Sequence, residues 1–167
     1  MIKSKITVLN TGGTFNKRYN PLKGELEVPT DNIALEEIIQ NCFNVDFEII
    51  NIISKDSLEI IDEDRDILIE TIKKLENENI IVVHGTDTID ITAKYLNNRI
   101  ENKKIVLTGA MVPMSIKKVE ATLNFAQAIG FLNAKISNGI YISMHGAVKS
   151  YDKLLKNRIL GQFLIEE

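Results

Sequence analysis

The sequence predicts a three-layer α/β/α domain built on a mainly parallel sheet. Five short runs rich in Ile and Val lack a clean alternation with polar residues, which is typical of strands buried on both faces. Segments with helical spacing separate these runs, and strands that alternate with helices imply right-handed crossovers between parallel strands. The predicted strands are Ile6–Leu9, Glu48–Ile53, Ile80–His84, Ile105–Thr108 and Ile140–Met144.

The helices are predicted from apolar residues that recur every three or four positions. A shorter helix is expected to begin after Thr30 and Asp31, which suit a helix N-cap, and to end near Cys42. We expect the apolar stripes to face the core. The three stripes are Ile61, Leu68, Ile72 and Leu75; Ile89, Ala93, Leu96 and Ile100; and Val119, Leu123, Ala126 and Gly130.

Length and composition favour one soluble domain over residues 1–167. The chain has 167 residues, of which 44% are hydrophobic and 26% are charged, as in ordinary globular proteins. The formal charge of −3 gives no electrostatic reason to expect binding to nucleic acid or to an anionic membrane. No apolar stretch reaches the length of a membrane span.

The few cysteines and histidines argue against a disulfide or a zinc cluster. Cys42 is the only cysteine, and His84 and His145 are the only histidines. We therefore expect no metal and no cofactor. The N-terminal apolar run, Ile6–Leu9, is too short for the core of a signal peptide, so a cytoplasmic location is expected.

Every predicted strand is followed by a small cluster of polar residues and glycines. In open parallel sheets, ligands bind in the crevice beyond the carboxyl ends of the strands, so the site is expected at this edge. The clusters are Thr11–Thr14, Ser54–Ser57, His84–Thr88, Thr108–Ala110 and His145–Gly146.

Residues 11–30 break the compact pattern. Their glycines, together with Asn20 and Pro21, predict a long loop with mobile parts, and such loops often serve as lids. Taken alone, Thr11–Thr14 also fits a plain turn from a strand to a helix. Likewise, Thr86 or Asp87 alone also fits a helix cap.

Amide hydrolysis needs a nucleophile, a proton acceptor and stabilisation of an oxyanion. Threonine is a weak nucleophile until a base removes its proton, and a lysine of lowered pKa can be that base. A neighbouring carboxylate orients such a lysine but raises its pKa, so burial has to oppose that effect. Asp87 supplies a carboxylate, whereas spacing alone does not choose among the lysines.

Two segments resemble the signature motifs of the bacterial L-asparaginases. They are Val8–Thr14 (VLNTGGT) and Val82–Thr88 (VVHGTDT), and the second lies at the end of the third strand, as the family requires. Ile49–Ser54 and Val106–Pro113 fit the family in order and separation. The resemblance spans essentially the whole chain but only the family's N-terminal catalytic domain, as in a short-chain form whose smaller C-terminal domain is absent.

The resemblance implies the catalytic residues. Thr14 matches the family's primary nucleophile, and Thr86, Asp87 and Lys156 match its proton-handling triad. Lys156 is located by counting from the end of the fifth strand, so the final segment has to fold back across the strand ends. Accounts of the family differ over which threonine attacks first, and this sequence does not decide between them. Tyr19, the only tyrosine in the lid, is assigned the role of the lid tyrosine.

The resemblance also implies a substrate-binding set. Ser54 matches the serine that binds the substrate α-carboxylate, and Asp87 would also pair with the α-amino group. The Ala110 carbonyl belongs near the oxyanion region, and the remaining members of the set are Gly13, Gly85 and Lys55. The departures from the family pattern include Lys55 in place of a common glutamine, Phe15-Asn16 after the first motif, and Glu120–Asn124 in place of a turn containing Asp-Gly. Tyr19 also lies closer to Thr14 than the family's lid tyrosine does to the nucleophile.

The function that the resemblance implies is hydrolysis of L-asparagine to L-aspartate and ammonia, by a homodimer or a higher homo-oligomer. The absent domain normally donates an acidic residue to the substrate amino group, so we expect a raised KM.

Three alternatives stay open. A flavodoxin-like flavin protein fits because Thr11–Thr14 also resembles a phosphate-cradling loop, although the chain has no tryptophan. A non-catalytic amino-acid-binding domain is the second alternative. The amide-processing domain of a transfer-RNA-dependent amidotransferase is the third, and the acidic chain disfavours it.

Overall fold

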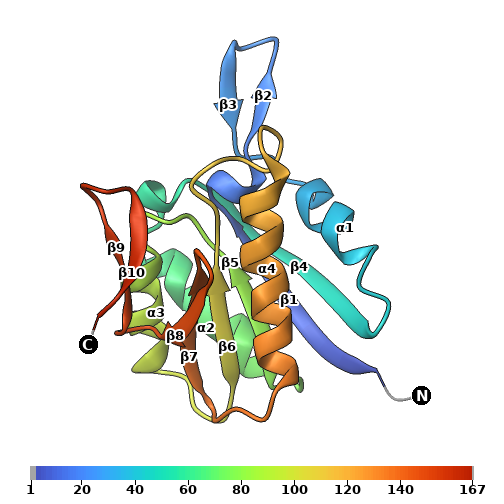
Figure 1. The fold of residues 1–167 in the computed structure, drawn as a ribbon, viewed down its shortest axis with the longest axis vertical. Helices are drawn as coiled ribbons and strands as arrows, with labels where there is room; N and C mark the ends of the chain where they lie inside the picture. Colours follow the sequence, from blue (N-terminus) through green and yellow to red (C-terminus); the bar gives the residue numbers. More distant parts are fainter. Residues whose placement is uncertain (1–2, 167) are drawn as a thin grey trace.

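A computed structural model describes residues 3–166 and shows a central sheet between two helical layers (Figure 1). The strand order is β4-β1-β5-β6-β7-β8; the first five strands are parallel, and β8 pairs antiparallel with β7. The predicted mainly parallel α/β fold is therefore confirmed, with one additional edge strand. The six strands are β1 (Ser4–Gly12), β4 (Val45–Lys55), β5 (Asn79–Val83), β6 (Lys104–Thr108), β7 (Gly139–Met144) and β8 (Ala147–Ser150).

Helices cover both faces of this sheet (Figure 1). Helices α1 (Ile33–Ile39) and α4 (Lys118–Asn133) pack on one face, and α2 (Asp62–Lys74) and α3 (Ile89–Asn97) pack on the other. Neighbouring residues of a strand enter opposite cores because side chains alternate across a sheet. In β5, for example, Ile81 joins the core under α1 and α4, whereas Val82 joins the core under α2 and α3.

The predicted core stripe of α4 was wrong. Val119 and Leu123 are 65% and 53% exposed, and Ala126 and Gly130 are also exposed. The helix carries apolar residues on both sides, so its periodicity alone did not identify the buried face. The face that packs on the sheet consists of Ala121, Asn124, Phe125, Ala128, Ile129 and Leu132.

On α2 and α3 most of the predicted stripe residues are buried. Leu75 and Ile100 are partly buried, and Ile61, which precedes the first turn of α2, is 53% exposed.

The segment predicted as a long loop contains regular structure. A 3-10 helix, η1 (Thr14–Asn16), is followed by an antiparallel hairpin of β2 (Arg18–Asn20) and β3 (Glu25–Glu27), which projects from the body of the domain (Figure 1). These strands are only three residues long and mostly polar, which explains why no strand pattern marked them in the sequence.

A second hairpin forms near the C-terminal end of the chain. It consists of β9 (Leu154–Asn157) and β10 (Gln162–Ile165), and Leu154 and Phe163 anchor it in the core beside α3. A further 3-10 helix, η2 (Ser57–Glu59), follows β4. No helix within residues 3–166 is both long and apolar enough to cross a membrane.

The order of the strands fixes where a ligand crevice opens. From β1 the chain crosses to β4 on one side and then returns to β5 on the other, so the direction of winding reverses between β1 and β5. In doubly wound sheets, ligands bind beyond the carboxyl ends of the strands at such a switch point. A ligand-binding site is therefore expected at the loops after β1 and β5.

Candidate active site

The loops that follow β1 and β5 pack backbone against backbone. A Cβ atom added to Gly13 would lie 2.4 Å from the backbone nitrogen of Gly85, and φ of Gly13 is 75°. The Gly13 N–H also donates to the Lys55 carbonyl at 2.9 Å, which ties the loop after β1 to the end of β4. Only glycine fits this contact, so it brings the loops of Thr14 and Thr86 together.

Thr14 is held by the residues that follow it. Phe15 is fully buried, with its ring centroid 6.2 Å from that of Phe125. Asn16 donates from Nδ2 to Asn10 Oδ1 at 3.0 Å and to the Gly12 carbonyl at 2.7 Å. Phe15-Asn16, a departure from the family pattern, thus anchors η1 and leaves Thr14 partly exposed just after the end of β1.

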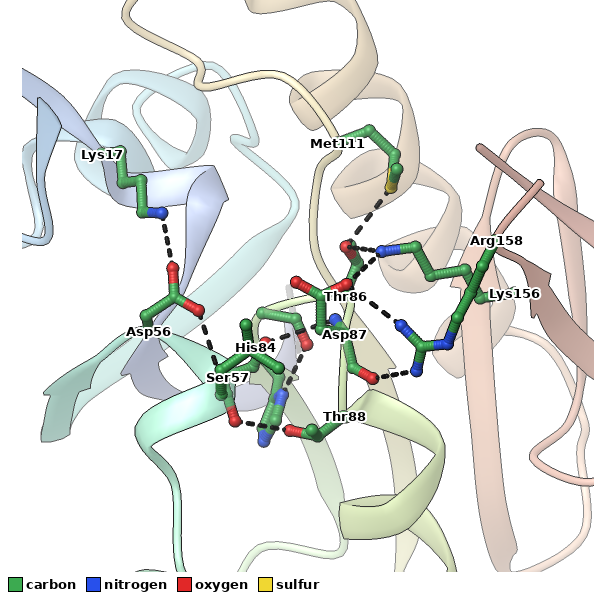
Figure 2. Close-up of polar contacts among 12 residues, drawn as sticks. Lys17, Asp56, Ser57, His84, Thr86, Asp87, Thr88, Met111, Lys156 and Arg158 are labelled. Carbon is green, nitrogen blue, oxygen red and sulfur yellow. Dashed lines mark hydrogen bonds and ion pairs between the residues drawn. The ribbon is translucent and has the colours of Figure 1, made fainter. Parts of the chain in front are cut away.

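The structure brings Thr86, Asp87 and Lys156 together (Figure 2). Lys156 donates from Nζ to Thr86 Oγ1 at 3.0 Å and to Asp87 Oδ1 at 2.7 Å. The Thr86 hydroxyl in turn donates to Met111 Sδ at 3.3 Å. Thr86 is 5% exposed and the Lys156 side chain is 11% exposed, so this lysine meets the hydroxyl in a largely dehydrated place. Within residues 3–166 no hydrogen bond joins Thr14 to this group.

Arg158 is a neighbour of the triad that the sequence reasoning missed. Its guanidinium donates to Asp87 Oδ1 at 3.3 Å and to the Asp87 carbonyl at 2.6 Å (Figure 2). Arg158 lies in the turn that follows β9, two residues beyond Lys156, so no strand pattern marked it in the sequence. Asp87 therefore faces two cations, one largely buried and one 60% exposed.

Ser57 is a second residue that the sequence reasoning did not assign. It is 1% exposed, and its Oγ accepts the Asp87 N–H at 3.2 Å, while its carbonyl accepts the Thr88 hydroxyl at 2.8 Å (Figure 2). A Cβ on Gly85 would lie 2.5 Å from the Ser57 Cβ. Ser57 therefore shapes the turn that presents Thr86 and Asp87.

An ion pair links the base of the projecting hairpin to the loop after β4. Lys17 Nζ lies 2.5 Å from Asp56 Oδ2, and both side chains are less than a third exposed. Burial raises the pKa of Asp56, but the hydrogen bonds from Lys17 and from the Leu58 N–H outweigh it, so the net pKa is lowered. Asp56 thus stays ionised and fixes Lys17 near η1.

Three other predicted site residues, Ser54, Ala110 and Tyr19, lie outside the triad. Ser54, at the end of β4, donates to Asn51 Oδ1 at 3.4 Å, and Ala110 is buried in the loop after β6. Tyr19 is 63% exposed on the projecting hairpin, and no hydrogen bond joins it to the triad within residues 3–166.

The ammonium group of Lys55 forms an ion pair with Asp64 on α2. It donates to both carboxylate oxygens of Asp64, at 2.9 and 2.8 Å, and Asp64 also accepts the Ile61 N–H at the start of α2. This ion pair serves the first turn of a helix, so the structure does not direct the Lys55 ammonium toward Thr86. Elsewhere too, residues 3–166 contain no group of three His, Cys, Asp or Glu side chains suited to a metal ion.

His84 lies beneath the site in a chain of hydrogen bonds. Its Nδ1 bonds the Gly85 carbonyl at 2.8 Å, so this nitrogen carries the proton, and its Nε2 faces the Thr92 hydroxyl at 2.9 Å. Arg65 Nε donates to the same hydroxyl at 3.0 Å. Burial lowers the pKa of His84 to about 4, and the Gly85 bond opposes that shift only in part. This neutral, fully bonded ring is a support for the turn at Gly85.

The lowered pKa of His84 predicts a loss of stability in mild acid. Its ordinary pKa of 6.5 applies to the unfolded chain, which therefore binds more protons than the folded chain between about pH 4 and 6.5. Lowering the pH from 7 to 4.5 should reduce the free energy of unfolding by about 2 kcal/mol through this group. Urea unfolding of wild type and His84→Gln at both pH values measures the difference, and equal losses in the two proteins would contradict it.

Comparisons with known proteins show which family this chain is similar to. Residues 5–158 match the family described as asparaginase, N-terminal. An L-asparaginase of Thermococcus kodakarensis is 29% identical over 161 residues, which cover 94% of this chain and 49% of that protein. A component of the glutamyl-tRNA(Gln) amidotransferase of Pyrococcus furiosus is 32% identical over 151 residues, which cover 84% of this chain and 33% of that protein.

Solved structures show the same fold. The thermostable L-asparaginase from T. kodakarensis superimposes with a TM-score of 0.85 at 27% identity, over 96% of this chain and 51% of that one. A probable cytoplasmic L-asparaginase from Campylobacter jejuni superimposes with a TM-score of 0.81 at 26% identity, over 96% of this chain and 52% of that one. The chain thus spans about half the length of these two solved relatives.

Proposed function

This chain belongs to the asparaginase family, and we propose that it is an amidohydrolase that converts L-asparagine to L-aspartate and ammonia. The observation that carries the proposal is the contact of Lys156 with both Thr86 and Asp87. A lysine within 3.0 Å of a buried hydroxyl is at the distance that proton transfer needs. An ion pair that served only the surface would not enclose a threonine hydroxyl in this way.

The proposed reaction has two halves. In the first, Thr14 Oγ1 attacks the side-chain amide carbon, the C–N bond breaks, and ammonia leaves with a proton delivered through the triad. In the second, water attacks the resulting acyl-threonine ester, which releases aspartate and restores the hydroxyl. Lys156 takes and returns the proton through Thr86, and Asp87 holds the lysine in place.

Substrate recognition is proposed for the backbone and side chains around the crevice. Ser54 would bind the substrate α-carboxylate, and Asp87 would bind the α-ammonium. Gly13 and Gly85 would contribute by letting the two threonine loops approach each other closely, and the Ala110 carbonyl would lie beside the oxyanion region. Arg158 already occupies one Asp87 oxygen, so it would compete with the α-ammonium, in line with the raised KM expected for asparagine.

A second candidate is amide processing within a transfer-RNA-dependent amidotransferase. Several relatives, 30 to 32% identical, are named as components of glutamyl-tRNA(Gln) amidotransferases. Such a role would use the same residues but hand ammonia to a partner protein. Substantial ammonia release by the isolated chain from free L-asparagine would favour the first candidate.

We also propose a cytoplasmic homodimer. The location rests on the C. jejuni relative, which is named as cytoplasmic. The dimer is the commonest homo-oligomeric state. Light scattering of the purified protein measures the assembly.

Ammonia release from L-asparagine, L-glutamine and D-asparagine by the purified protein tests the proposed function. We expect turnover of L-asparagine with a KM above the micromolar range, and slower turnover of the other two substrates. Lys156→Met protein, purified in the same way, controls for contaminating host asparaginase. Ammonia release that persists unchanged in this variant would refute the proposal, as would a lack of turnover on all three substrates.

A further inference from the structure

His145 lies outside the triad but is connected to two of its members. It occupies the two-residue turn between β7 and β8, where φ is 50° for His145 and 87° for Gly146. Positive φ at both positions is what the tight I′ hairpin turn requires. The imidazole is 24% exposed, and it contacts α4 through one nitrogen and β10 through the other.

The bonding partners fix which nitrogen carries the proton. The Phe163 N–H donates to His145 Nδ1 at 3.1 Å, so Nδ1 is the acceptor of a neutral ring. The proton then lies on Nε2, which donates to Glu120 Oε1 at 3.1 Å. The edge-on packing of the His145 and Phe163 rings, with centroids 5.8 Å apart, adds to this contact. His145 thus bridges Glu120 on α4 and Phe163 on β10.

On the Glu120 side the bridge leads to Thr86. The carboxylate of Glu120 accepts the N–H groups of Met111 at 2.7 Å and Val112 at 3.1 Å. Met111 in turn accepts the Thr86 hydroxyl through its sulfur. Glu120 therefore fixes the loop that supplies a partner to the catalytic hydroxyl.

On the Phe163 side the bridge leads to Lys156. Phe163 and Lys156 are paired across the β9–β10 hairpin, so the bond to His145 holds the strand directly opposite the lysine. Lys156 Nζ in turn donates to Thr86 Oγ1 at 3.0 Å, so the contacts of His145 lead to Thr86 by both routes. A two-stranded hairpin is only marginally stable alone, so outside contacts have to fix its position.

From these contacts we propose that His145 and Glu120 are positioning residues that hold the Lys156 ammonium at Thr86. The effect on catalysis rests on the function proposed above, but the effect on Lys156 itself does not. The two residues touch no reacting atom in this proposal. They act by keeping the hairpin and the loop after β6 in a fixed relation, and a displacement of about 1 Å at a catalytic group can cost about 100-fold in rate.

Paired substitutions of His145 test the bridge. His145→Ala removes both bonds, and we expect kcat to fall by about 10- to 100-fold while KM changes by less than about threefold. His145→Asn keeps an amide oxygen near the place of Nδ1 and tolerates positive φ, so it should restore kcat to within about threefold of wild type. Gln162→Ala, on the same strand with an exposed side chain, is the matched control and should keep the wild-type kcat.

A second readout does not depend on activity. Mass spectrometry after brief treatment with an amine-specific reagent measures the labelling rate of Lys156, whose side chain is 11% exposed in the folded protein. We expect several-fold faster labelling in His145→Ala and the wild-type rate in Gln162→Ala. If the wild type hydrolyses no amide, the proposed function fails while the labelling rates still decide the bridge. Unchanged labelling in His145→Ala, or an equal loss of kcat in the alanine and asparagine variants, would overturn it.

Discussion

Replacing Lys156 with methionine is expected to lower kcat for amide hydrolysis by about 1000-fold or more. The variant removes the only ammonium within bonding distance of the Thr86 hydroxyl in the described residues 3–166, and methionine keeps similar length and bulk. The fold should survive, because Asp87 is 37% exposed and keeps its ion pair with Arg158. Steady-state ammonia release gives kcat, and thermal unfolding checks that the protein is intact.

Two further variants distinguish the loss of a proton acceptor from the loss of a positive charge beside Asp87. Lys156→Arg keeps a cation beside Asp87, but a guanidinium does not lose its proton at neutral pH, so this variant should be almost as inactive as Lys156→Met. Arg158→Met removes a cation from the same carboxylate without touching Thr86, so its kcat should fall by less than about tenfold. Lys156→Met that retained more than about a tenth of the wild-type kcat would remove this lysine from the mechanism.

Replacing Gly13 with alanine is expected to damage both stability and activity. The added Cβ would lie 2.4 Å from the Gly85 nitrogen and 2.5 Å from its Cα, and both are backbone atoms that cannot swing aside. The loops after β1 and β5 would have to separate, which should cost about 3 kcal/mol or more of unfolding free energy. Because Thr14 and Thr86 lie on these loops, kcat should fall by about 100-fold or more.

Gly24 offers a matched control for this prediction. Its φ of 72° is nearly that of Gly13, yet a Cβ added there meets no atom within 4 Å. Gly24→Ala should therefore cost only the conformational penalty of about 1 kcal/mol, with kcat unchanged. Urea unfolding and ammonia release measure both variants. Equal effects of the two substitutions would show that positive φ, and not the contact with Gly85, sets the importance of Gly13.

The parallel sheet was predictable because its signal is local. A strand covered on both faces needs apolar side chains at successive positions, and such runs can be recognised without knowing their neighbours. The buried face of α4 was not predictable in this way, because Val119 and Leu123 continue an apolar stripe that points to solvent. The polar hairpin of β2 and β3 was missed because its three-residue strands carry no pattern.

The edge of the sheet that carries the candidate site could also be predicted from the sequence. The clusters of Thr14 and of Thr86 and Asp87 follow strands that end at the same edge, and this placement needs only the direction of the chain. Ser57 and Arg158 were not found, because their roles depend on bonds to Asp87 from segments distant in the sequence.

By itself, then, the sequence determined the sheet, the edge that carries the candidate site and the two threonine loops, since each follows from the order of residues along the chain. The resemblance to the asparaginases indicated Lys156, but only the tertiary structure decided that its ammonium reaches the Thr86 hydroxyl. Lys156 lies 70 residues from Thr86, and the two meet because the core residues Leu154 and Phe163 seat the last hairpin over the strand ends. A contact of that range depends on packing between elements, and the residue pattern around a lysine does not encode it.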